Sequence, residues 1–100
     1  MKESNEMEKI DQKFKEIKGT VASLRLDSVA SLGFGISRNK AADFIKAGRV
    51  SVNHEVTLSL TKKVNEGDTI LIVGKGRVVL EKVGGTTKKG RTSLELKKYI

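Results

Sequence analysis

The sequence predicts a small α+β domain, in which two or three N-terminal helices precede a mainly antiparallel sheet of about four or five strands. Its 100 residues are enough for one domain with a single core. Apolar residues recur at helical spacing before Gly48 and at strand spacing after it. Gly, Asn and Asp interrupt the second half at short intervals, as hairpin turns require.

Residues 5–18, NEMEKIDQKFKEIK, are predicted to form the first helix, which Gly19 ends. An apolar stripe recurs every three or four residues and consists of Met7, Ile10, Phe14 and Ile17. Residues 1–18 hold five Lys and five acidic residues, so their charges cancel. We interpret 1–18 as an N-terminal helical extension or linker and 19–100 as the domain. The alternative is a helix that docks a partner protein through its stripe.

Two further helices are expected between residues 27 and 48. Asp27 is a plausible N-cap for a short helix over DSVASLG, and Gly33 and Gly35 allow the chain to turn after it. Ser37 is predicted to cap the next helix, RNKAADFIKAG, and Gly48 to stop it. The sequence therefore predicts two consecutive short helices.

Strands are expected over residues 49–53, 69–73, 77–83 and 92–99, which read RVSVN, TILIV, RVVLEKV and TSLELKKY. Turns are predicted at 65–68, 74–76 and 84–85. These runs suit a sheet built mainly from hairpins.

The composition excludes several chemistries. The chain has no Cys and one His, so thiolate catalysis, Cys-based zinc sites and disulfides are ruled out, and no metal-ligand spacing occurs. The Gly- and Lys-rich stretches at 74–77 and 84–91 lack the P-loop order and lie between strands. The longest apolar runs are far shorter than the roughly 20 residues of a membrane helix. We therefore expect a soluble, cytoplasmic protein without catalytic residues, cofactor or small-molecule substrate.

The positive charge lies in residues 19–100, which hold 15 Lys and Arg against 7 acids and so carry the whole net charge of +8. A basic domain of this kind points to a polyanion, first nucleic acid and second an anionic membrane. Around the two helices lie Arg25, Ser37, Arg38, Lys40, Lys46 and Arg49. The free N–H groups at the second helix start add to an anion site. Phosphate contact is the prediction, against an ordinary solvated charged face.

The order of short motifs sharpens this prediction. RLD at 25–27, SRNKA at 37–41, IKAGRVSVN at 45–53 and EGDTI at 66–70 resemble the RNA-binding domain named after the fourth small-subunit ribosomal protein. Its αL motif is two helices followed by a β-hairpin. The flanks, GTVASLRLDSV and GKGRVVLEKVGGTTKKGR, resemble the C-terminal part of the YlmH-type proteins of Gram-positive bacteria.

This resemblance implies an RNA-binding face across the two helices and the following turn, which adds Asn53 to the six residues above. Many family members have Gly after this Asn, but this chain has His54, which favours a turn other than type I′. The basic residues that match the YlmH-type flank, and whose RNA contact is extrapolated from charge, are Lys75, Arg77, Lys88, Lys89 and Arg91.

The expected function is therefore a non-catalytic, monomeric module that binds ribosomal RNA or tRNA through phosphate and shape contacts. The resemblance implies a role at the ribosome in translation quality control. Two alternatives stay open. The chain is the appended domain of an RNA-modifying enzyme whose catalytic part is absent, or a protein-interaction module that uses its N-terminal helix.

Overall fold

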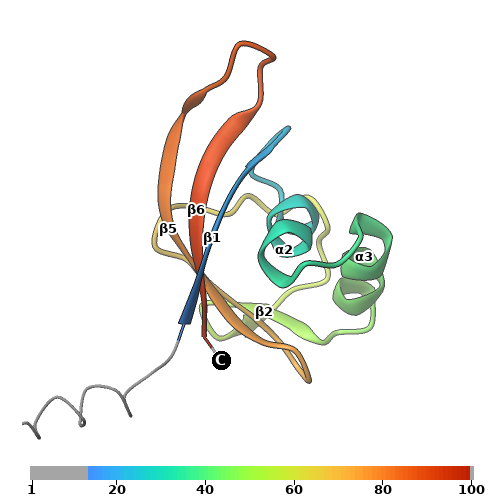
Figure 1. The fold of residues 1–100 in the computed structure, drawn as a ribbon. Coiled ribbons are helices and arrows are strands. Elements are labelled where there is room, and N and C mark those ends of the chain that lie inside the picture. The colour runs from blue at the N-terminus through green and yellow to red at the C-terminus, as the bar shows by residue number, and fades with distance from the viewer. Residues whose placement is uncertain (1–13, 100) are drawn as a thin grey trace, which may run out of the picture.

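The computed structural model describes residues 14–99, which form two helices and six strands (Figure 1). The predicted α+β class is confirmed, and the sheet has six strands where about four or five were predicted. In chain order the elements are β1 (Phe14–Val21), α2 (Leu26–Phe34), α3 (Arg38–Lys46), β2 (Val50–Val52), β3 (Glu55–Val56), β4 (Thr69–Ile72), β5 (Gly76–Thr86) and β6 (Thr92–Tyr99).

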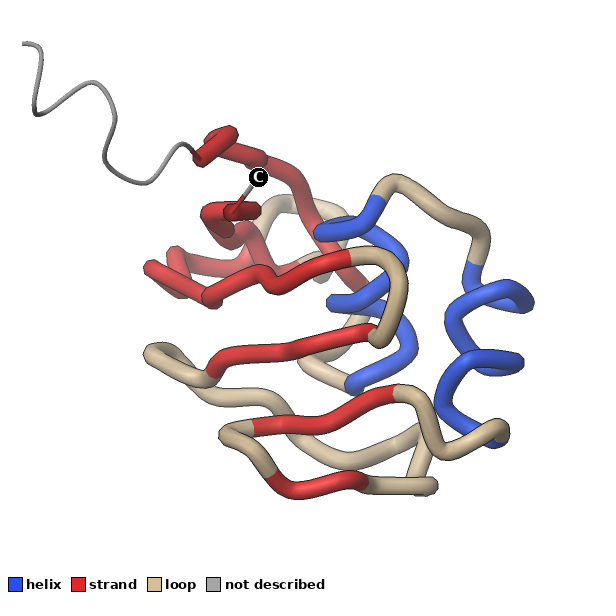
Figure 2. Tube along the Cα trace, turned by 90° about the horizontal axis from the view of Figure 1, so that it is seen from below, coloured by secondary structure: helices blue, strands red, loops and turns tan. Residues whose placement is uncertain are grey.

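The strands form one sheet in the order β1-β6-β5-β4-β2-β3, and every neighbouring pair is antiparallel. Both helices lie on the same face of the sheet (Figure 2). The long β5–β6 hairpin extends past the helices at the top of Figure 1. The helices thus cover only part of the sheet, and the hairpin forms an arm.

The core lies between the helices and the covered face of the sheet. Alternate residues of each strand point to one face, so a strand that is half-buried shows alternating apolar residues. β4 buries Ile70 and Ile72 but exposes Leu71. The other fully or nearly fully buried apolar side chains include Leu26, Val29, Ala30, Ala41, Ile45, Val50, Val64, Val78, Leu80, Leu94 and Leu96. The core is almost entirely aliphatic.

The predicted first helix is wrong over residues 14–18, which belong to strand β1. β1 pairs with β6 along its whole length, with Phe14 opposite Tyr99 and Ile17 opposite Leu96. The pairing satisfies the backbone of β1 and covers the edge of β6, which a surface helix would leave open. Met7 and Ile10, the rest of the predicted stripe, lie outside the described residues.

β1 also explains Gly19, which was predicted to end the helix. Gly19 lies inside β1 on the face that meets α2, and a Cβ there would be 2.7 Å from Leu32 Cδ1. The absence of a side chain lets β1 approach α2 closely. The expected boundary between residues 18 and 19 falls within this strand.

The helix ends follow the prediction in α3 but not at the start of α2. Arg25, not Asp27, is the N-cap of α2, and it makes no side-chain cap. In α3, Ser37 Oγ accepts a hydrogen bond from the Lys40 N–H at 3.0 Å, and Gly48 follows the C-cap with φ of 77°. The α3 caps are confirmed; Asp27 has another role, described below.

The β5–β6 turn lies later than predicted. Gly84 and Gly85 continue β5 instead of ending it, and the chain reverses over 87–91, where the Thr87 N–H bonds the Arg91 carbonyl at 2.7 Å. A Cβ at Gly84 would lie 2.5 Å from Ser93 Oγ, so glycine permits the close approach of β5 and β6. Gly84 thus serves strand packing, a role that the sequence pattern does not distinguish from a turn.

The turn at Asn53–His54 joins β2 to β3. Asn53 has φ of 52° and His54 has φ of 74°. Two central residues with positive φ are what a type I′ hairpin turn requires. The expectation of another turn at His54 is therefore wrong.

Candidate nucleic-acid interface

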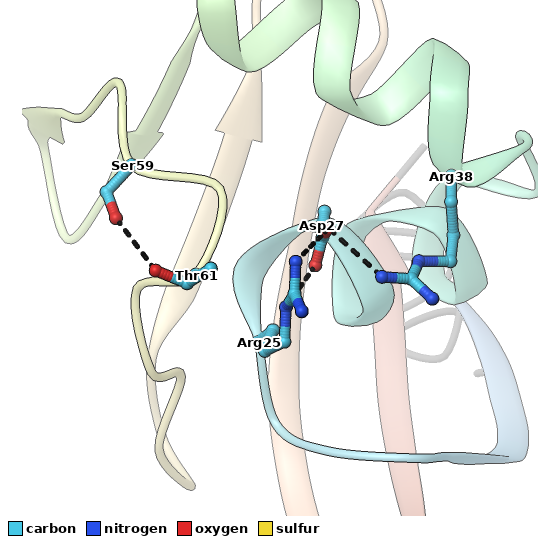
Figure 3. Close-up of polar contacts among 5 residues, drawn as sticks. All are labelled: Arg25, Asp27, Arg38, Ser59 and Thr61. Carbon is cyan, nitrogen blue, oxygen red and sulfur yellow. Dashed lines mark hydrogen bonds and ion pairs between the residues drawn. The ribbon is translucent and has the colours of Figure 1, made fainter.

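Two arginines from different elements converge on one buried carboxylate (Figure 3). Arg25, at the α2 start, donates from Nε to Asp27 Oδ1 at 3.2 Å and from Nη2 to Oδ2 at 2.9 Å. Arg38, in the first turn of α3, donates from Nη2 to Asp27 Oδ2 at 3.2 Å. The Asp27 side chain is 6% exposed, whereas those of Arg25 and Arg38 are 39% and 56% exposed. We call these two arginines the guanidinium pair.

The ionisation of Asp27 follows from this arrangement. Burial raises the pKa of the carboxyl, but hydrogen bonds and charge from Arg38 and Arg25 outweigh burial, so the pKa lies below its ordinary value. Asp27 is therefore an anion at neutral pH. It neutralises one of the two guanidiniums and holds both in place, so the pair keeps a net positive charge on an exposed surface.

The N-terminus of α3 adds to this positive potential. Its first turn contains no acidic residue, although the helix dipole favours one there, and Arg38 and Lys40 lie in that turn instead. The Ser37 hydroxyl accepts the Lys40 N–H, as predicted for a cap. Two cations at the positive end of a helix are unfavourable alone, and an external anion relieves this.

Lys40 lies about 200° round the helix from Arg38, because each residue advances about 100°. It shares a helix face with Phe44, whose ring centroid is 6.0 Å from Lys75 Nζ. Lys75, from the β4–β5 turn, therefore lies on the same side of α3 as Lys40. The cations at α3 thus form two groups, the guanidinium pair and the Lys40–Lys75 side.

The remaining cations near α3 lie towards its C-terminal end. Lys46 is exposed in the last turn, where the helix dipole itself favours a cation. Arg49 is exposed in the segment before β2, and its carbonyl accepts the Val73 N–H at 3.0 Å. The β4–β5 turn with Lys75 is thereby held beside the α3–β2 connection.

The Asn53 side chain makes hydrogen bonds that stabilise the fold. Its Nδ2 donates to Asp68 Oδ1 at 2.9 Å, and its Oδ1 accepts the Thr69 N–H at 3.0 Å. Asp68 also accepts the Asn65 N–H at 2.8 Å. The side chain thus joins the β2–β3 turn to the loop before β4. The Asn of VN and the Asp of EGD form one structural bridge.

Arg77 lies apart from the α3 groups. It is paired with Tyr99 across β5 and β6, and its Cζ is 4.6 Å from the Tyr99 ring centroid. Its neighbour Val78 is buried beneath the helices, so Arg77 points to the opposite face of the sheet. The structure therefore does not bring Arg77 together with Arg25 or Arg38.

The basic residues between 88 and 91 also fall into two groups. Lys88 and Lys89 are exposed in the turn of the β5–β6 hairpin, at the end of the arm seen in Figure 1. Arg91 instead donates from Nε to Thr20 Oγ1 and from Nη2 to the Thr20 carbonyl, both at 2.9 Å. Arg91 ties β1 to β6, while the two lysines remain exposed.

Two residues that the pattern did not single out as site residues lie at the guanidinium pair. Asp27 was predicted only as a helix cap. Lys63 lies in the loop before β4 and forms an antiparallel bridge with Arg25. Asp27 could have been recognised from the sequence as a site residue, because it lies two positions from Arg25, a predicted phosphate ligand. No local pattern marks Lys63.

The structure of residues 14–99 adds two negative findings. Within this range, no three His, Cys, Asp or Glu side chains gather closely enough to hold a metal ion. Neither helix in this range has the length and apolar character needed to cross a membrane.

The fold and the basic surface around α2 and α3 agree with a known family of domains. Residues 24–70, from just before α2 into β4, match the family model of the S4 domain. The match includes the guanidinium pair, α3 and the β2–β3 hairpin. The resemblance drawn from RLD, SRNKA, GRVSVN and EGD is confirmed.

A protein of Bacillus subtilis and a solved crystal structure are among those similar to this chain. Ribosome-associated protein quality control protein P2 of Bacillus subtilis (strain 168) is 43% identical over 72 residues, which are 72% of this chain and 28% of the relative. A crystal structure of pseudouridylate synthase aligns with a TM-score of 0.50 and 25% identity, over 63% of this chain and 26% of that one. The chain spans less than a third of either protein.

Proposed function

We propose that this protein is a non-catalytic module that binds structured RNA, either ribosomal RNA or tRNA, through its guanidinium pair and the cations of α3. The observation that carries the proposal is the sharing of buried Asp27 by two exposed arginines. Arginine presents several N–H donors in a fixed plane, which suits phosphate oxygens. A carboxylate that fixes two such groups from different elements prepares a surface for a phosphate backbone.

The mode of recognition follows from the side chains available. Stacking of unpaired bases requires exposed aromatic rings, but near α2 and α3 Phe34 is buried and Phe44 half-buried. Phosphate contacts determine affinity and position, and shape selects structured RNA. The surface therefore favours a folded RNA over a single strand.

The cellular setting is part of the same proposal. The name of the Bacillus subtilis relative places that protein at the ribosome in protein quality control. We infer the same setting for this chain, as a monomer in the cytoplasm without a cofactor. Crosslinking in living cells, followed by sequencing of the attached RNA, tests this: ribosomal RNA or tRNA is expected, and messenger RNA alone contradicts it.

The direct test replaces Arg38, Lys40 and Arg49 with Ala together. Each phosphate contact contributes roughly 0.7 to 0.9 to the slope of log affinity against log salt concentration, so the slope should fall by that amount per contact. Binding of purified ribosomal RNA and bulk tRNA at several salt concentrations measures it.

The matched control replaces Lys15, Lys18 and Lys82 with Ala. These exposed lysines lie on β1 and β5, and the net charge changes equally. The control should retain the wild-type slope. Equal slopes for all three proteins contradict the assignment of the RNA surface to α3.

A second candidate function is the RNA-binding appendage of a larger RNA-modifying enzyme. The similarity to a pseudouridylate synthase, of which this chain spans 26%, favours it. The complete gene decides between the two, since a catalytic domain needs well over a hundred further residues. Its presence in the same reading frame establishes the enzyme, and in either case the S4 domain supplies the RNA contact.

A further inference from the structure

Arg25 has a second basic neighbour besides Arg38, brought to it by backbone pairing. The Leu26 N–H donates to the Lys62 carbonyl at 2.8 Å, and the Val64 N–H donates to the Leu24 carbonyl at 2.8 Å. These two bonds flank an antiparallel bridge between Arg25 and Lys63. This is the narrow, non-hydrogen-bonded type of pair, in which opposed side chains leave the backbone on the same side, with Cβ atoms about 4.5 to 5.5 Å apart.

Two like charges directly opposite each other destabilise a strand pair. Asp27 does not remove the problem, because its single carboxylate is shared between Arg25 and Arg38. Arg25 and Arg38 therefore share one carboxylate, while Lys63 lies opposite Arg25 without contacting that carboxylate. Among residues 14–99, the Lys63 ammonium makes no ion pair. The site therefore has an excess of positive charge that an external anion would balance.

A pocket opens at this pair. Its volume is about 440 Å³, and its polar lining consists of Ser23, Arg25, Thr61, Lys63 and Thr92. Thr61 Oγ1 lies 3.5 Å from Ser59 Oγ in the loop that passes Arg25 (Figure 3). The two cations are hydrogen-bond donors, and the three hydroxyl groups can also donate to phosphate oxygens. No carboxylate lines the pocket.

We propose that this pocket binds one phosphodiester of the RNA, with Lys63 and Arg25 as its two cationic ligands. This inference rests on the proposed function and extends the RNA surface from α3 to the loop before β4. The Arg25 Nη1 group is not used by Asp27 and is free for the phosphate. Thr92 is the first residue of β6 and follows the 87–91 turn, so the pocket also lies between the α2 start and the turn end of the β5–β6 arm.

The test compares Lys63→Gln with Lys62→Gln in the full chain. Both variants lose one positive charge, but neighbouring side chains in a paired strand point to opposite sides, and Lys62 does not line the pocket. Purified ribosomal RNA and bulk tRNA are the probes. Lys63→Gln should lower the salt slope by roughly 0.7 to 0.9, while Lys62→Gln keeps the wild-type slope. Lys63→Arg should restore it.

Thermal unfolding without RNA gives a second readout. If Lys63 stabilised the fold, its replacement would lower the melting temperature, whereas the proposal expects a rise. Lys63→Gln relieves the repulsion with Arg25, so its melting temperature should rise by roughly 1 to 4 °C. Inorganic phosphate, compared with chloride at equal ionic strength, should stabilise the wild type more than this variant.

The outcomes separate this inference from the proposed function. If Lys63→Gln keeps the wild-type slope while the α3 triple variant lowers it, the pocket proposal is overturned and the RNA function stands. If the wild type binds neither RNA, the proposed function and the phosphodiester both fail. A lower melting temperature of Lys63→Gln also overturns the proposal, because it shows that the like-charge pair is not strained.

Discussion

At the scale of single residues, the acidic and amide side chains of the S4 motifs maintain the fold and the basic ones remain exposed. Asp27 holds Arg25 and Arg38, and Asn53 bridges to Asp68 and Thr69. Glu66 accepts the Val83 N–H at 2.9 Å and so ties the loop before β4 to β5. RLD, VN and EGD therefore share a structural task, which is to join segments distant in sequence, and in RLD the bonds also place two arginines.

Replacing Asp27 with Asn tests this role. The variant loses charge-assisted hydrogen bonds to both arginines, so the free energy of unfolding should fall by about 1.5 to 3 kcal/mol at pH 7. Because the pKa of Asp27 is depressed in the folded state, its stabilisation is present above the unfolded pKa of about 3.9 and is lost as the pH falls through the lower folded value.

The difference in free energy of unfolding between wild type and Asp27→Asn, measured in urea, should therefore be largest at pH 7 and shrink below about pH 4. A difference that stays constant or widens towards pH 3 contradicts the assigned role of the Asp27 carboxylate. Comparing the two proteins at each pH cancels the titration of the other carboxyl groups that they share.

The Asn53–His54 turn offers a paired prediction. His54 is exposed and has φ of 74°, a backbone conformation that costs a residue with a Cβ roughly 1 kcal/mol. His54→Gly should therefore stabilise the protein by up to about 1 kcal/mol. Asn53→Gly gives the same backbone freedom but removes the bonds to Asp68 and Thr69, so it should destabilise it. Denaturant unfolding measures both, and equal shifts would contradict the bridge.

At the scale of elements, β1 shows how pairing overrides a helical pattern. Phe14 and Ile17 fit a helical stripe, but in β1 they lie on opposite faces of the sheet: Phe14 is 44% exposed, with its ring centroid 6.1 Å from that of Tyr99, and Ile17 packs against the core. Short helices are marginal in water, whereas an exposed sheet edge offers a full ladder of hydrogen bonds.

The packing of β1 predicts that substitutions at two neighbouring residues lower the free energy of unfolding by different amounts. Ile17→Ala should lower the free energy of unfolding by about 1 to 2 kcal/mol, less than for a fully buried Ile because the side chain is half-buried. Lys18→Ala, on the uncovered face, should stay within about 0.5 kcal/mol of wild type. Urea unfolding of both variants checks this, and equal effects would argue against the observed register of β1.

At the scale of the whole molecule, the candidate RNA surface has two separate parts. One lies at α2 and α3, and the other is the tip of the β5–β6 arm with Lys88 and Lys89 (Figure 1). The pocket at Arg25 and Lys63 reaches the arm through Thr92, the first residue of β6 after the 87–91 turn. A folded RNA that meets α3 can therefore extend along the arm.

The last prediction concerns the tip of the β5–β6 arm. If the tip meets the RNA backbone, replacing Lys88 and Lys89 with Ala should reduce the salt slope by roughly 0.7 to 0.9 for each lysine in contact. The exposed turn should tolerate the change without loss of stability, which thermal unfolding verifies. Wild-type affinity and slope in this double variant would confine the RNA surface to the S4 domain.

The sequence by itself determined the α+β class, the α3 caps and the S4 motifs, because these depend on neighbouring residues: helical spacing, a Ser before a helix and a Gly after it. It also placed the exposed cations of α3. The tertiary structure alone decided that β1 is a strand, that Gly84 and Gly85 lie within β5, that Arg77 faces away from α3, and that Arg25 lies opposite Lys63. Each of these depends on pairing between distant segments, whose hydrogen bonds and contacts outweigh local preference.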